Sequence, residues 1–131
     1  MAAPGDLEAI RLGIDAYNRG DIEALIDRSC EDVEMVPMRS LMEGGEYRGH
    51  DGVRRFVGDM EEDWAQRSVE VDEIREVGEG FLVLGNFRAI GRASETEVRY
   101  PVAWHAIMRD GKLARLTAYS DQDTALAELD T

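Results

Sequence analysis

The chain has 131 residues, of which 44% are hydrophobic, and this length and composition suit one domain with its own core, spanning residues 1–131. Its 28 acidic and 15 basic side chains give a formal net charge of -13, which repels phosphate backbones and anionic headgroups, so neither nucleic acid nor a membrane is expected as a partner. A single cysteine, Cys30, excludes an internal disulfide, and the N-terminus lacks the pattern of a signal peptide. We therefore expect a cytoplasmic protein.

The first half of the chain carries the spacing of helices. A first helical stripe is formed by Leu7, Ile10, Ile14 and Tyr17. Gly20 then provides a stop, and Asp21 provides an N-cap for a second short helix. The segment "VEMVP" has the composition of a strand, and a glycine-rich segment after it closes with Asp51 as the expected cap of a third helix. The apolar face of that third helix is predicted to consist of Val53, Phe56, Val57, Met60 and Trp64.

The second half changes to the spacing of strands. Residues 68–77, 81–90, 97–108 and 112–120 are strand-like, and the short connections between them suit antiparallel neighbours. The tail "DQDTALAEL" reads as a short helix, with Asp121 as its expected cap. Helices followed by an antiparallel sheet predict an α+β fold in which the helices cover one face of the sheet.

The last two strands form a hairpin whose faces can be predicted. If Asp110 and Gly111 make a two-residue turn and the alternation is strict, His105 lies opposite Leu116 and Ala103 opposite Ala118, all on one face. The small side chains on that face predict an unfilled volume under the helices, and hence a ligand pocket. The opposite face carries Trp104, Met108 and Tyr119, and its bulk predicts a homodimer that packs through the outer sheet face.

In the order of its helices and strands and in several segments, the chain resembles the SnoaL-like branch of the nuclear-transport-factor-2-like superfamily. The matching segments are "AYNRGDIEALIDRSCEDVEMVP", "YRGHDGVRRFV" and "YPVAWHAIMRDGKLARLTAYSD", which leads into "DTALAEL". The resemblance implies a cone-shaped barrel, in which a curved, mixed and mostly antiparallel sheet wraps three N-terminal helices around an apolar pocket. It also implies relatives that are ketosteroid isomerases, limonene epoxide hydrolases or polyketide cyclases.

This chain lacks the complete catalytic set of two of these relatives. Matched to ketosteroid isomerase, Val36 stands at the aspartate base, Ala103 at the protonated aspartate and Gly13 at the tyrosine. Matched to limonene epoxide hydrolase, Arg99 is present, but Pro101 replaces the acid that should follow it. A polyketide cyclase uses a polar acid-base group on the pocket wall, and His105 can fill that position.

The candidate catalytic residues are therefore His105 and Glu34. His105 titrates near neutrality, and Glu34 shares a strand face with Val36 and could orient the imidazole or act as a base. The alternatives are a core histidine held by one hydrogen bond and a solvated glutamate. The predicted ligand-binding residues are Tyr17, Val36, Trp64, Arg99, Ala103, Leu116 and Ala118.

Three classes of function remain open from the sequence. The first is an isomerase, cyclase or hydrolase that uses His105 on a hydrophobic or polycyclic substrate. The second is a non-catalytic, dimeric module that binds a small hydrophobic molecule, and a third possibility is a structural dimerisation domain whose cone is filled by side chains. No metal and no other cofactor are expected, since two histidines in unrelated segments make no metal signature.

Overall fold

The computed structural model describes residues 5–36, 47–78, 80–119 and 121–129, and within these ranges the chain forms four helices and six strands. As predicted, three helices and an early strand occupy the first half of the chain, antiparallel strands fill the second half, and one short helix follows at the end. In chain order the elements are α1 (Asp6–Arg19), α2 (Ile22–Asp27), β1 (Ser29–Val36), β2 (Tyr47–Arg48), α4 (Gly49–Asp63), β3 (Trp64–Val77), β4 (Gly80–Gly91), β5 (Glu97–Arg109), β6 (Lys112–Tyr119) and α5 (Gln122–Leu129).

The helix boundaries follow local signals, with two corrections. Gly20 ends α1 in the left-handed conformation at φ 70°, and the Asp21 side chain accepts a hydrogen bond of 3.2 Å from the Ala24 backbone N–H, so both predicted signals are confirmed. The prediction that Asp51 caps the third helix is wrong, because α4 begins at Gly49 and Asp51 lies in its first turn. Trp64 is not helical either, since it is the first residue of β3.

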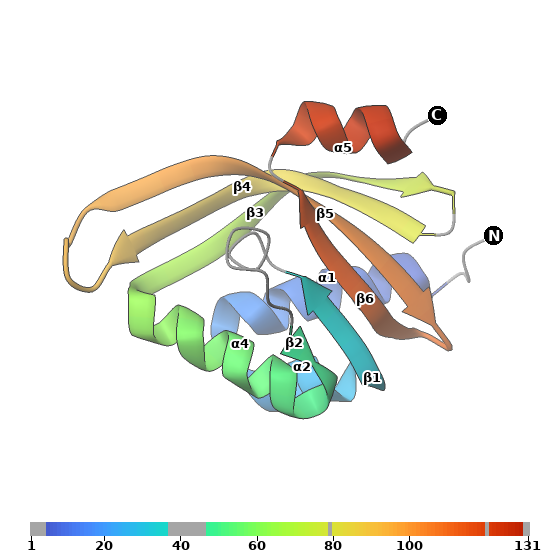
Figure 1. Ribbon diagram of the computed structural model, residues 1–131, viewed down its shortest axis with the longest axis horizontal. Coiled ribbons are helices and arrows are strands. Elements are labelled where there is room, and N and C mark those ends of the chain that lie inside the picture. Colours follow the sequence, from blue (N-terminus) through green and yellow to red (C-terminus); the bar gives the residue numbers. More distant parts are fainter. Residues whose placement is uncertain (1–4, 37–46, 79, 120, 130–131) are drawn as a thin grey trace.

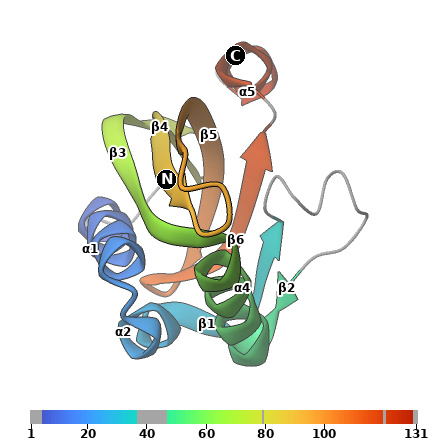
Figure 2. The ribbon, with the colours of Figure 1, turned by 90° about the vertical axis from the view of Figure 1, so that its left-hand side faces the viewer.

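The sheet is mixed and strongly curved. Its strand order is β2-β1-β6-β5-β4-β3, and only the β1–β6 pair is parallel. Helices α1, α2 and α4 lie against the concave face, and α5 lies on the opposite, convex face (Figure 1). The view along the molecule shows the strands arching around the three helices (Figure 2). The prediction of an α+β fold with a curved sheet around three N-terminal helices is confirmed.

Packing and hydrogen bonds fix the helices against the sheet. The Asn18 side chain at the end of α1 bonds both backbone groups of Val69, donating to its carbonyl at 3.0 Å and accepting from its N–H at 2.8 Å. Strand β3 is an edge strand, so Asn18 occupies the place of a missing neighbouring strand. Ile26, Val33 and Val53 form a separate buried cluster that joins α2, β1 and α4. These contacts hold the helices away from the middle of the concave face.

The β5–β6 hairpin has the predicted turn but not the predicted register. Arg109 pairs with Lys112, and Asp110 and Gly111 have φ values of 55° and 79°, as a type I′ turn requires. Past Met108 and Leu113 the register shifts by one residue, because Ala114 is bulged and has no partner in the ladder. The predicted pairing beyond this bulge is therefore wrong. The observed pairs are Ile107–Arg115, Ala106–Leu116, His105–Thr117, Trp104–Ala118 and Ala103–Tyr119.

The convex face is covered by α5 and by polar pairs. Ala125 of α5 is fully buried against Leu82, Leu84 and Ala103. The Gln122 amide nitrogen also donates to the carbonyls of the facing residues Gly85 and Val102, each at 3.1 Å. Farther along the strands, cross-strand ion pairs cover the face.

The residues found on the convex face change the argument for a dimer. Trp104 and Met108 lie on the concave side, whereas Tyr119 packs beside Ala103 and Ala125 on the convex side. Two of the three residues whose bulk motivated a homodimer are therefore not on the outer face. The homodimer stays a prediction without that support. Within the described ranges, no helix has both the length and the apolar character needed to cross a bilayer.

Candidate functional site

A cavity of about 470 Å³ lies between the concave face of the sheet and helices α1, α2 and α4. We call it the inner cavity. Its size is typical of sites for small organic ligands. Most of its wall is apolar. Its aliphatic and sulfur-containing wall consists of Ala9, Ile10, Ile14, Leu25, Met35, Val36, Met60, Val83, Val102, Ala106, Met108, Leu113, Leu116 and Ala118.

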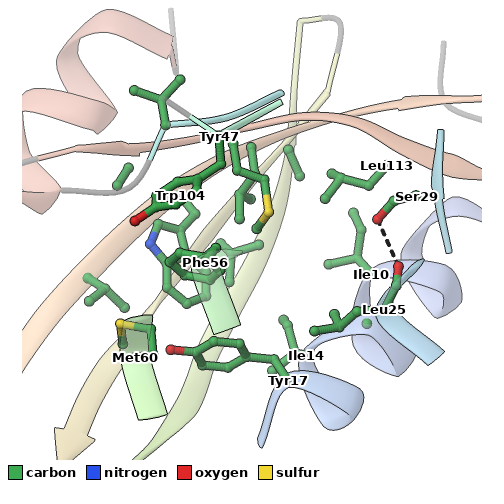
Figure 3. Close-up of a pocket in the computed structure, with 18 of the residues that line it drawn as sticks. Ile10, Ile14, Tyr17, Leu25, Ser29, Tyr47, Phe56, Met60, Trp104 and Leu113 are labelled. Atoms are coloured by element: carbon green, nitrogen blue, oxygen red, sulfur yellow. Dashed lines mark hydrogen bonds between the residues drawn. The ribbon is translucent and has the colours of Figure 1, made fainter. Parts of the chain in front are cut away.

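Aromatic rings form the remainder of the apolar wall. Seven of the nine aromatic residues in the chain line the inner cavity: Tyr17, Tyr47, Phe56, Trp64, Phe87, Tyr100 and Trp104. Phe56 stacks on Tyr17 at a centroid distance of 5.9 Å and meets Tyr47 edge-on at 5.6 Å. Trp104 meets Tyr17 edge-on at 6.4 Å, and Figure 3 shows these rings gathered around one space. Rings that brace one another in this way make a rigid wall for a flat ligand.

Gly13 leaves part of the cavity open on the side of α1. It lies in the interior of this helix, where glycine is about 1 kcal/mol less favourable than alanine. A Cβ atom at Gly13 would meet nothing within 4 Å, and Gly13 lines the inner cavity. The space beside Gly13 is therefore part of the volume that a ligand can fill.

One group of polar residues on the cavity wall includes Asp59 of α4. The Tyr47 hydroxyl donates a short hydrogen bond to Oδ2 of Asp59, and both residues line the inner cavity. The Trp104 ring nitrogen points to the same side as the Tyr47 hydroxyl (Figure 3), and it donates no hydrogen bond to any residue that the structure describes. We call Tyr47, Asp59 and Trp104 the polar edge of the cavity.

Tyr17 is buried in the wall as a neutral phenol. Its side chain is 8% exposed, and burial raises the pKa of Tyr17 to about 12, although the nearby Arg67 cation opposes this rise. The Arg67 guanidinium lies over the Tyr17 ring at 4.8 Å from its centroid. At neutral pH the Tyr17 hydroxyl therefore keeps its proton and does not act as a base.

Five of the predicted ligand-binding residues line the inner cavity. They come from α1, β1, β3 and β6, and they are Tyr17, Val36, Trp64, Leu116 and Ala118. Their contact with a ligand stays a prediction.

His105 and Ala103 do not line the inner cavity, contrary to the prediction. Both alternate with Trp104 along β5, and Trp104 faces inward. Ala103 is fully buried under α5, and Nε2 of His105 lies 3.1 Å from the position that a Cβ on Gly80 would take. A general base must reach the proton that it abstracts, so we assign His105 no role in this cavity.

Glu34 and Arg99 also lie away from the inner cavity. The Glu34 carboxylate pairs with Arg48 at 3.8 Å and with Arg115 at 3.7 Å. The exposed Arg99 guanidinium pairs with Glu70 at 3.2 Å. Both predicted pocket positions are wrong, and these groups instead form cross-strand ion pairs at the surface.

The polar edge was missed by sequence reasoning. Tyr47 and Asp59 are 12 residues apart, on β2 and α4, and no local sequence pattern predicts their contact. One signal was available, because Asp59 directly precedes Met60 and lies three residues after Phe56, two positions of the predicted apolar face.

The comparisons with known proteins agree with this architecture. A family model for the SnoaL-like domain matches residues 10–116, so the chain belongs to the SnoaL-like family. No protein of curated function matches the sequence.

Solved structures share the whole fold. A nuclear-transport-factor-2-like protein of unknown function from Burkholderia pseudomallei aligns with a TM-score of 0.80 at 20% identity, covering 98% of this chain and 100% of that one. TerC, co-crystallised with polyporic acid, aligns with a TM-score of 0.78 at 26% identity, covering 95% and 97%. A protein with a ketosteroid isomerase-like fold from Catenulispora acidiphila, in complex with trimethylamine, aligns with a TM-score of 0.77 at 14% identity, covering 96% and 92%.

Proposed function

We propose that this protein binds a small, flat, mostly apolar aromatic molecule in the inner cavity. The observation that carries the proposal is the concentration of aromatic rings, since seven of the nine in the chain surround one space of about 470 Å³. A core that needed only stability would fill such a volume with side chains. Flat aromatic ligands stack on rings of this kind, and burial of their faces supplies most of the binding free energy.

The likeness to TerC supports the same class of ligand. That protein was co-crystallised with polyporic acid, and it is 26% identical to this chain in an alignment that covers 95% of this chain. Polyporic acid is therefore a first compound to test. For quantitative work we choose 2-methoxynaphthalene, which is flat, uncharged and fluorescent.

Gly13 offers a direct test of where the ligand binds. A leucine side chain at this position projects into the inner cavity, so Gly13→Leu should weaken binding of 2-methoxynaphthalene by about tenfold or more, equivalent to about 1.4 kcal/mol. Fluorescence titration of the probe measures this change.

Gly58 provides the matched control. It is also a helical glycine, on α4, and a Cβ there also meets nothing within 4 Å, but Gly58 does not line the inner cavity. Both leucine variants should raise the helix propensity, and only Gly13→Leu should lose the probe. Equal affinity in the two variants would contradict the proposal.

A further inference from the structure

The polar edge of the inner cavity has the parts of a proton-accepting site. Asp59 is a carboxylate on the wall of an otherwise apolar cavity, and the Tyr47 hydroxyl bonds its Oδ2 atom. This bond fixes the orientation of the carboxylate, as a third group orients the base in many active sites. The second oxygen of Asp59, Oδ1, accepts no hydrogen bond from any of the described residues.

A hydrogen-bond donor, the Trp104 ring N–H, belongs to the wall of the same cavity. The Trp104 ring nitrogen and the Tyr47 hydroxyl point the same way in Figure 3, although they come from β5 and β2. An indole N–H can only donate a hydrogen bond. It therefore suits a ligand oxygen that is neutral or becomes negative, whereas a carboxylate suits a ligand hydroxyl.

We propose that Asp59, held by Tyr47, is a general base for a phenolic or enolic hydroxyl of the aromatic ligand. The inference rests on the binding proposed above. In this step the ligand O–H bond breaks, the proton moves to Oδ1 of Asp59, and the electron pair stays on the ligand oxygen. Asp59 becomes neutral, the ligand becomes an oxyanion, and the Trp104 N–H stabilises the new negative charge. Tyr47 keeps its own proton and acts as a positioning residue.

Asp59 shares the wall of the inner cavity with other titratable groups. The other groups that titrate on the cavity wall are Arg28, Asp63 and the tyrosines Tyr17, Tyr47 and Tyr100. The pKa values of Tyr17 and Tyr100 are raised by burial, so both are neutral at neutral pH. Asp63 lies on the same helix and also lines the cavity.

A photoacid tests the proposal with a spectroscopic readout. The probe 2-naphthol has the shape of 2-methoxynaphthalene and is neutral at neutral pH, but it becomes a strong acid when excited. Bound to the wild-type protein, it should emit as the naphtholate, because Asp59 takes its proton. With Asp59→Asn the bound probe should emit as neutral naphthol, and its affinity should fall about tenfold.

Two variants complete the experiment. Glu62→Gln removes one negative charge from an exposed position of the same helix, and it should keep the naphtholate emission. Tyr47→Phe releases the carboxylate, so it should reduce the naphtholate fraction while the probe still binds, and it serves as a second variant if Asp59→Asn does not fold.

The two proposals fail in different ways. If 2-methoxynaphthalene does not bind to the wild-type protein, the proposed function fails. If it binds, but bound 2-naphthol emits as the neutral form or Asp59→Asn keeps the naphtholate emission, only the assignment of Asp59 as a base is overturned.

Discussion

At the scale of single residues, Tyr17 contributes both to the packing of the inner cavity and to its electrostatics. Its ring stacks on Phe56 and lies under the Arg67 guanidinium, and its hydroxyl is buried with it. The raised pKa of about 12 means that the folded protein holds this proton more tightly than the unfolded chain, where the pKa is 10.0. Stability from this source is complete below about pH 10 and is lost as the pH rises towards 12.

We therefore expect an alkaline loss of stability that depends on Tyr17. Between about pH 9 and pH 11, the free energy of unfolding of the wild-type protein should fall by about 1 kcal/mol more than that of Tyr17→Phe. Urea unfolding at the two pH values measures the difference. Tyr100→Phe is the comparison, because this partly exposed residue also has a raised pKa but lies outside the core. An identical fall in wild type and Tyr17→Phe would show that Tyr17 titrates normally.

At the scale of elements, α5 depends on a few contacts with the convex face of the sheet. It has eight residues, too few to be stable alone, and Ala125 is its fully buried residue. Gln122 adds two hydrogen bonds to backbone carbonyls of β4 and β5, at Gly85 and Val102. Both carbonyls belong to buried residues, so a missing donor leaves them without compensation.

Gln122→Ala should therefore lower the free energy of unfolding by about 1–3 kcal/mol. The measurement is urea unfolding, with Gln66→Ala on the exposed side of β3 as a control that should change stability by less than about 0.5 kcal/mol. A loss no larger than that of the control would mean that α5 is held by packing alone.

The β5–β6 hairpin shows which features of an element can be predicted from sequence. The Asp110–Gly111 turn was predictable because both residues tolerate positive φ, and the dipeptide is a strong local signal. The bulge at Ala114 has no comparable signal, and one extra residue exchanges the faces of every residue beyond it. This is why Leu116 was predicted on the cavity side correctly, while His105 was paired with it wrongly.

The prediction of which sheet face lines the pocket also rested on an assumption about side-chain size, and this assumption fails in this protein. Small side chains such as Ala103 were taken to border an unfilled volume, but Ala103 is buried under α5. The large side chains Trp104 and Met108 border the cavity instead, because the helices stand far enough from the sheet to leave space beyond them. That spacing is set by contacts between distant segments, such as Asn18 with Val69, which no single stretch of sequence reveals.

At the scale of the whole molecule, the order of elements was sufficient to predict the fold. Helices followed by antiparallel strands, with the matching segments from Ala16 to Leu129, indicated a SnoaL-like architecture, and the family match confirms it. The architecture does not determine the chemistry, since one fold hosts many activities. In this chain the chemistry depends on what the concave face and α4 present to the inner cavity.

The central claim is that a flat aromatic molecule binds on the concave side of the sheet, and alanine methyl groups report this directly. In an NMR titration with 2-methoxynaphthalene, the methyl signals of Ala106 and Ala118 should shift through ring currents, because both line the inner cavity. The signals of Ala103 and Ala125, buried together on the convex side, should stay in place. Shifts at Ala103 and Ala125 without shifts at Ala106 and Ala118 would contradict the account.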